Sequence, residues 1–207
     1  MKISRGLLPC AALFCSVNAF AATSPVSDYL TCGAKSFSVI TLAPFKSQVP
    51  QTVENGRPKL QGGTKTDLGQ RWVFDKPIEA DGLTFTGFFS DNMNLGGAQI
   101  ISWGFYVQQT PEQVAASVKK LSAIELQKAD SIFVRPEVWS ESRQAWQSES
   151  AGNNAGKVTA DTSERVLLIE PAPEDVKGST GMLTCSIQGN ISDAAMKSSR
   201  PDLLPAR

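Results

Sequence analysis

The chain has 207 residues, of which 41% are hydrophobic, and its 20 Lys and Arg are matched by 20 Asp and Glu. The length and apolar content suit a single globular domain, and the balanced charge gives no basic patch of the kind that binds nucleic acid. Histidine is absent, which excludes Ser-His-Asp and Cys-His catalysis and the usual zinc centres of enzymes.

The first residues have the pattern of a secretory signal peptide. Lys2 and Arg5 precede a short apolar stretch over residues 7–17, and Ala19-Phe20-Ala21 forms a small-x-small cleavage site. No other run approaches the roughly 20 apolar residues that a membrane span needs. We therefore expect cleavage of residues 1–21, no membrane span, and a soluble mature protein in the periplasm or the secreted fraction.

Two cysteines, Cys32 and Cys185, remain after that cleavage. In an oxidising compartment they most simply form one disulfide, which would close a loop of roughly 150 residues and contribute up to about 5 kcal/mol. Because no CxxC spacing or other soft ligand accompanies them, we expect neither a redox pair nor a metal site. The bond would join the first and last strands, with 22–30 as a leader, 31–191 as the domain and 192–207 as a flexible tail.

The amino-terminal half is predicted to form strands separated by turns and loops. Alternation predicts a first strand at Ser36–Leu42, a long Pro- and Gly-rich connection over residues 43–70, and a short strand at Arg71–Asp75. A hairpin follows, with strands over residues 83–90 and 98–108 joined by the turn-rich segment 91–97. Its second strand should bury Ile101, Trp103, Phe105 and Val107 on one face.

One helix is predicted, beginning after Thr110. Thr110 suits the N-cap, Pro111 the first helical position, and Gln113 completes a T-x-x-Q capping box. The apolar stripe indicates a helix over residues 111–121 that packs on the sheet.

The carboxy-terminal half again favours strands. Residues 132–139 alternate and can pair with residues 143–148, a polar loop covers residues 148–162, and two late strands lie at 164–170 and 182–187. With about seven or eight strands and one main helix, the fold class is α+β, a predominantly antiparallel β-sheet with the helix packed on it and one disulfide.

Catalytic motifs are weak. Ser117-Val118-Lys119-Lys120 matches the S-x-x-K signature of acyl-serine enzymes but lacks its S-D-N and K-T-G partners, so a solvated helix face explains it better. A chain with 20 acids offers many carboxylate pairs without pointing to a glycosidase site. We therefore expect no enzyme activity and no cofactor.

The segment Asp91–Gly97 is a candidate binding loop. Asp91, Asn92 and Asn94 resemble the start of an oxygen-rich Ca²⁺ loop, but Met93 stands where such a loop needs an oxygen ligand. A plain hairpin tip is the better interpretation, and the three polar residues are kept as binding candidates without a metal.

Tryptophans supply the other candidates. If Ile132, Val134 and Val138 point inward, Phe133 and Trp139 point outward, giving with nearby residues a patch that resembles an interface hot spot. The candidate binding residues of this patch are Phe133, Arg135, Trp139, Arg143 and Trp146. The same rings could stack on a sugar, or they could form a second layer of core beneath the long loops.

These observations predict an exported, non-enzymatic binding protein that captures another protein. Periplasmic inhibitors and immunity proteins against secreted toxins or hydrolases are often small, exported α+β domains with long loops. The comparison rests on architecture alone, since no motif of such a family is present. The alternative is a periplasmic module that binds a small ligand or an envelope glycan.

Overall fold

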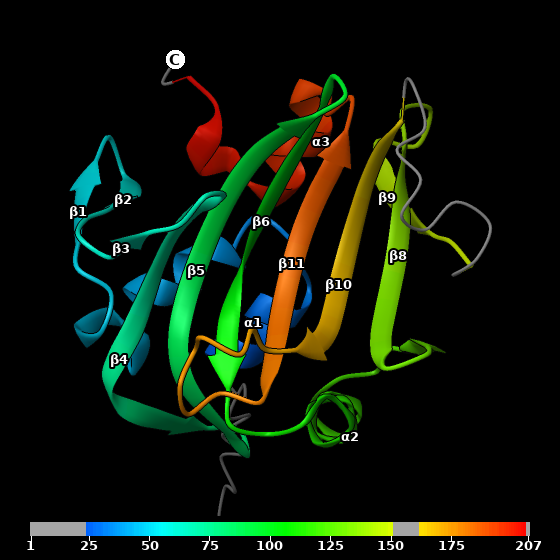
Figure 1. The fold of residues 1–207 in the computed structure, drawn as a ribbon. Helices are drawn as coiled ribbons and strands as arrows, with labels where there is room; N and C mark the ends of the chain where they lie inside the picture. Colours follow the sequence, from blue (N-terminus) through cyan, green and yellow to red (C-terminus); the bar gives the residue numbers. More distant parts are fainter. Residues whose placement is uncertain (1–23, 151–161, 206–207) are drawn as a thin grey trace, which may run out of the picture.

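The computed structural model describes residues 24–150 and 162–205 (Figure 1). The expected signal peptide, residues 1–21, lies outside the described residues, as does most of the expected loop 148–162. The α+β class is confirmed, because a large antiparallel sheet dominates, with few helices beside it.

The main sheet has nine strands in the order β3-β4-β5-β6-β11-β10-β8-β7, with β9 also paired to β8. Every strand pair is antiparallel. The strands are β3 (Thr64–Lys65), β4 (Gly69–Ala80), β5 (Leu83–Leu95), β6 (Ala98–Val107), β7 (Gln127–Ala129), β8 (Ile132–Ser140), β9 (Ala145–Ser148), β10 (Ser163–Pro171) and β11 (Gly181–Gly189). A separate hairpin consists of β1 (Gln51–Glu54) and β2 (Arg57–Leu60).

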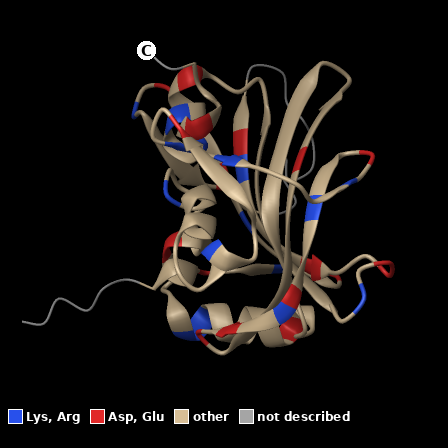
Figure 2. Ribbon diagram, turned by 90° about the vertical axis from the view of Figure 1, so that its left-hand side faces the viewer, with Lys and Arg blue, Asp and Glu red and all other residues tan. Residues whose placement is uncertain are grey.

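One face of this sheet, the inner face, is covered by helices. These are α1 (Pro25–Leu30), α3 (Asp193–Ser199) and three 3-10 turns, η1 (Phe37–Thr41), η2 (Phe45–Ser47) and η3 (Pro201–Leu203). Figure 1 shows them behind the sheet, and Figure 2 shows the sheet from its side with the same helices along one face. The main core fills this layer, and the predicted buried face of β6 is confirmed, since Ile101, Trp103, Phe105 and Val107 are at most 2% exposed.

The predicted helix is confirmed as α2 (Pro111–Leu121). The Thr110 side chain accepts from the backbone N–H of Gln113, and the Gln113 side chain accepts from that of Thr110, so the capping box is complete. Val114 and Val118 are fully buried, which fixes the helix against the ends of the sheet strands.

The strand predicted at Ser36–Leu42 is wrong, because these residues contain η1. Three hydroxyl groups each donate to the backbone carbonyl three residues earlier: Ser36 to Gly33, Ser38 to Lys35 and Thr41 to Ser38. Such local bonds compete with a strand ladder and favour helical turns. The β-branched and aromatic side chains that suggested a strand instead point into the core.

The segments expected as a leader and a tail are both packed against the sheet. Residues 25–30 form α1, whose Tyr29 hydroxyl donates to the backbone carbonyl of Leu183 at 2.8 Å. Residues 193–203 form α3 and η3, where Ser199 and Arg200 are buried. The disulfide between Cys32 and Cys185 is confirmed, but it joins the end of α1 to β11 rather than two strands.

Two expected connections also contain regular structure. The connection predicted over residues 43–70 includes η2, β1, β2 and β3. The turn-rich segment predicted over residues 91–97 is mostly strand, because β5 continues to Leu95 and β6 begins at Ala98. Gly96 and Gly97 alone make the turn, with φ of 61° and 89°, the left-handed conformations that a two-residue hairpin turn requires.

Candidate binding surface

The second face of the main sheet, which we call the outer face, is the candidate binding surface. Side chains alternate between the two faces along each strand. The pairing registers put the even-numbered residues of β6, β11, β10 and β8 opposite one another, so these residues share one face. The outer-face residues of these four strands are Ile100, Ser102, Gly104 and Tyr106; Met182, Thr184, Ser186 and Gln188; Glu164, Val166, Leu168 and Glu170; and Ile132, Val134, Pro136 and Val138.

Charge is scarce on this part of the outer face. Among the residues just named, Glu164 and Glu170 carry the only charges, and aliphatic side chains such as Val166 and Leu168 occupy its middle, partly exposed. An antiparallel sheet with one face in water normally alternates apolar and polar residues. β11 follows that pattern, with Thr184, Ser186 and Gln188 on the outer face. β10 and β8 depart from it, because Val166, Leu168, Val134 and Val138 also lie there.

A loop of residues 172–180, between β10 and β11, folds back over one end of the outer face (Figure 1). Val176, at its centre, is 2% exposed and forms a small cluster with Phe89 and Tyr106. Two polar contacts hold the loop: the Arg71 Nη1 group lies 2.8 Å from Asp175 Oδ2, and the hydroxyls of Thr86 and Ser179 are 2.7 Å apart. The loop therefore bounds the open area on the side of β4 and β5.

Asp91, a predicted binding residue, lies beside this loop on the outer face. In the sheet, Asp91 lies opposite Gly69 of β4 and Ser102 of β6. Burial raises the pKa of its carboxyl, and the charge of Arg71 partly opposes that shift. Burial likewise raises the pKa of Tyr106 to about 12, so the phenol stays protonated and available as a hydrogen-bond donor.

Asn92 and Asn94 belong to β5 and support the hairpin. The Asn94 Oδ1 atom accepts from the backbone N–H of Gly97 at 3.2 Å, and Asn92 Oδ1 accepts from Gln99 Nε2 at 3.4 Å. Both bonds are local, and they explain why polar residues stand at the end of this hairpin.

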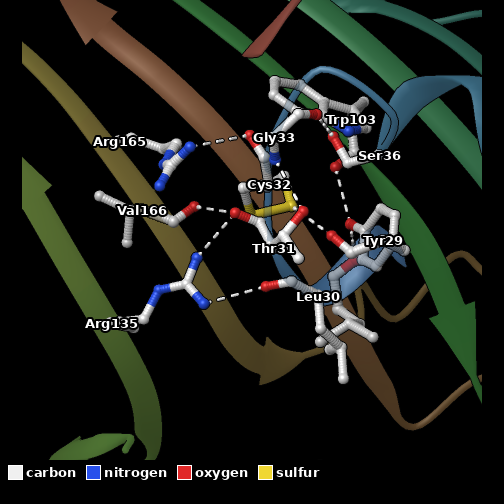
Figure 3. The surroundings of a disulfide bond; sticks show 12 residues. Tyr29, Leu30, Thr31, Cys32, Gly33, Ser36, Trp103, Arg135, Arg165 and Val166 are labelled. Carbon is white, nitrogen blue, oxygen red and sulfur yellow. Dashed lines mark hydrogen bonds between the residues drawn. A yellow bond between two sulfur atoms is a disulfide. The ribbon is translucent and has the colours of Figure 1, made fainter. Parts of the chain in front are cut away.

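Arg135 lies at the interior side of β8 (Figure 3). Its guanidinium donates to the carbonyls of Leu30 and Thr31, at 3.0 and 3.1 Å, at the carboxy-terminal end of α1. Cations at a helix carboxy-terminus satisfy carbonyls that lack partners in the helix. The structure thus gives this predicted binding residue an internal role.

Glu137 links Arg135 to a second arginine, Arg165. Glu137 Oε2 lies 3.2 Å from Arg135 Nη2 and 2.8 Å from Arg165 Nη2, and all three side chains are at most 15% exposed. Burial lowers the pKa of Arg135, an effect that the charge of Glu137 opposes and that of Arg165 reinforces. Arg165 also approaches the carbonyl of Cys32 at 3.5 Å, so the network supports the backbone beside the disulfide.

Trp139 and Trp146 contact each other, as the predicted pairing of these segments requires. Their rings meet edge to face with centroids 5.2 Å apart. Trp146 packs against the main core, donates from Nε1 to Ser198 Oγ at 2.7 Å and lies 4.7 Å from the guanidinium of Arg165. Arg143 donates to the side chain of Gln147.

Four residues of the predicted patch, Phe133, Arg135, Trp139 and Trp146, lie on one side of β8 and β9, but this is the inner face and not the outward one that was expected. Phe133 and Trp139 share the inner face with Arg135, and Val134 and Val138 lie on the outer one. The single strand could not decide this, since both of its faces carry large apolar side chains.

Phe133 instead lines an open groove beside α2, with a volume of about 470 Å³. Its other apolar walls are Ala115, Ala116, Ile124 and Leu126. Lys128 lies over the Phe133 ring at 5.4 Å.

Within residues 24–150 and 162–205, no helix is long and apolar enough to cross a membrane, and no group of three or more Cys, Asp or Glu could hold a metal ion. Comparisons of the chain with protein-family models, with curated proteins and with solved structures gave no match.

Proposed function

We propose that this chain is an exported, non-enzymatic protein that captures another protein on the outer face of its sheet. The signal-peptide pattern of residues 1–21 and the disulfide between Cys32 and Cys185 support export to an oxidising compartment. The site of action that we propose is the periplasm or the secreted fraction.

The observation that carries the proposal is the charge-poor composition of the outer face on β6, β11, β10 and β8. Depletion of charge is what distinguishes the core of a protein interface from ordinary surface. With strands about 4.8 Å apart and about nine residues long, four strands cover roughly 600 Å² in projection. A stable interface buries about 800 Å² per partner, so these four strands alone can supply most of one.

A protein of this kind acts by occupying its partner. An inhibitor or immunity protein binds a secreted toxin or hydrolase and blocks it sterically, which needs a large complementary surface and no catalytic group. The partner class that we propose is such a hydrolase or toxin.

The test is affinity capture from an envelope and secreted extract, using the mature chain and variants that place a lysine on either side of the sheet. Leu168→Lys and Ser186→Lys put a charge on the outer face, and Leu42→Lys puts one on an exposed leucine of the inner side. Ser186 is polar and partly exposed, so its variant tests the face even if Leu168→Lys folds poorly.

We expect one stoichiometric protein to be retained by the wild type and by Leu42→Lys, and to be lost from both outer-face variants. Inhibition of a hydrolase by the wild type alone would identify the class of partner. Equal retention by all folded variants would remove the outer face from the proposal, and retention of no protein would remove protein capture.

A second candidate function, the binding of a small ligand, is favoured by the groove beside α2. Its volume of about 470 Å³ lies within the roughly 300–1,000 Å³ typical of ligand pockets. The decisive observation would be a small molecule or glycan that co-purifies with the wild type and is lost from an Ala116→Trp variant, which fills the groove.

A further inference from the structure

Glu170 stands out on the outer face because its surroundings are apolar. It pairs with Met182 of β11, and the next outer-face residue of its own strand is Leu168. On the other side β8 contributes Val134, opposite Leu168, and Ile132. Burial raises the pKa of Glu170, and no neighbouring charge among the described residues offsets that shift.

The second carboxylate of this face is satisfied within the chain. Glu164 is 4% exposed, and its Oε2 atom accepts from Gln188 Nε2 at 2.8 Å. Among the described residues Glu170 has neither an ion pair nor a side-chain hydrogen bond.

The nearby cations are engaged elsewhere. Arg71, on the same face, is paired with Asp175 of the loop 172–180. Lys128 of β7 lies over the ring of Phe133 on the inner face. The remaining charges of the loop that follows β10 are Glu174 and Lys177, and neither contributes to the pKa shift of Glu170.

From this placement we propose that Glu170 receives a lysine or arginine side chain of the captured protein at the apolar end of β10. This inference rests on the proposed function and specifies the partner: an apolar patch that carries a cation. Charge complementarity selects such a partner over a second copy of this chain, because the outer face of β6, β11, β10 and β8 holds only acidic charge.

The physical reason is desolvation. A carboxylate that has already lost part of its hydration in the free protein loses little more when a partner covers it. A cation delivered to it then forms a close charge pair away from water, and such pairs can contribute clearly to affinity at interfaces. An exposed carboxylate would gain far less from the same contact.

The experiment compares Glu170→Gln with Glu174→Gln, using as probe the protein that the wild type retains from the extract. Both variants remove one negative charge, and glutamine keeps the shape of the side chain. Glu174 is an exposed residue of the neighbouring loop, so its variant controls for the change in net charge. Dissociation constants are measured at pH 4 and at pH 7, at one salt concentration.

We expect Glu170→Gln to weaken binding at least about tenfold, and Glu174→Gln to change it less than about threefold. Wild-type binding should also weaken as the pH falls through the raised pKa of Glu170. Binding by the Glu170→Gln variant should not show this pH dependence. Equal affinities of wild type and Glu170→Gln, with Leu168→Lys still abolishing capture, would overturn the cation site and leave the proposed function standing. If Leu168→Lys also bound normally, or no protein were retained, both would fail.

Discussion

Arg200 stacks on Phe37: its guanidinium carbon lies 3.7 Å from the centroid of that ring, and 4.9 Å from the ring of Trp103. The same guanidinium is held by Asp202 in a bidentate ion pair at 2.9 and 2.8 Å. A side chain that is 3% exposed thus fastens the end of α3 to the turn η1 and the sheet.

Replacing Arg200 with alanine should lower the free energy of unfolding by about 3 kcal/mol, because it removes a buried stacked side chain and leaves the Asp202 carboxylate without its cation. Urea denaturation followed by tryptophan fluorescence measures this. Lys197→Ala, an exposed change one helical turn earlier, should cost less than about 0.5 kcal/mol. A small effect of Arg200→Ala would show that the carboxy-terminal segment adds little to the fold.

The sequence predicted those parts of the fold whose local signals agree with their packing. Thr110 and Gln113 specify the start of α2, and the alternation around Trp103 specifies a strand with one buried face. At Ser36–Leu42 the local signal misled, because β-branched residues also suit short turns whose hydroxyls bond to the preceding backbone.

The candidate surface was beyond prediction from the sequence. A strand such as β8 has Phe133 and Trp139 on one face and Val134 and Val138 on the other, and only its neighbours decide which face α1 covers. The isolation of Glu170 depends on residues of three strands that are distant in the chain. No local pattern carries that information.

Substitution of Glu137 should destabilise the protein more than substitution of any other buried acidic residue, since two arginines share its carboxylate. Glu137→Gln is expected to lower the free energy of unfolding by about 3 kcal/mol, because it leaves two partly buried cations poorly compensated. Glu54→Gln removes an exposed ion pair with Lys59 and should change stability by less than about 1 kcal/mol. Chemical denaturation at neutral pH compares the two, and similar effects would contradict the importance of the network.

The disulfide should resist reduction in the folded protein, because Cys32 and Cys185 are both 0% exposed. Mass spectrometry of the chain without residues 1–21, after treatment with dithiothreitol and iodoacetamide, should find no labelled cysteine in native buffer and two in urea. Labelling under native conditions would indicate frequent opening of the α1 segment. The double variant Cys32→Ala, Cys185→Ala should lose up to about 5 kcal/mol of stability by the chain-entropy account.

Trp146→Ala should lower stability more than Trp139→Ala. Trp146→Ala removes a hydrogen bond to Ser198, the contact with the Arg165 guanidinium and part of the core packing. We expect it to lower the free energy of unfolding by about 3 kcal/mol or more. Trp139 loses mainly its edge contact with Trp146, worth about 0.5–1.5 kcal/mol beyond its buried area. Melting temperatures of the two variants test the order. If Trp139→Ala also abolished capture without lowering the melting temperature, this pair would belong to the binding surface.

The free protein should carry a pH signature of Glu170. Since burial raises the pKa of this carboxyl above its ordinary value of 4.5, the folded state binds the proton more tightly than the unfolded state. Its contribution to stability is therefore greatest below about pH 4.5 and is lost as the pH rises towards the raised pKa. Glu170→Gln removes this penalty, so the variant should gain stability relative to wild type between pH 4 and pH 7. Urea denaturation at these two pH values measures the difference. A constant difference would mean that Glu170 is fully hydrated, and would remove the physical reason for a cation site on the outer face.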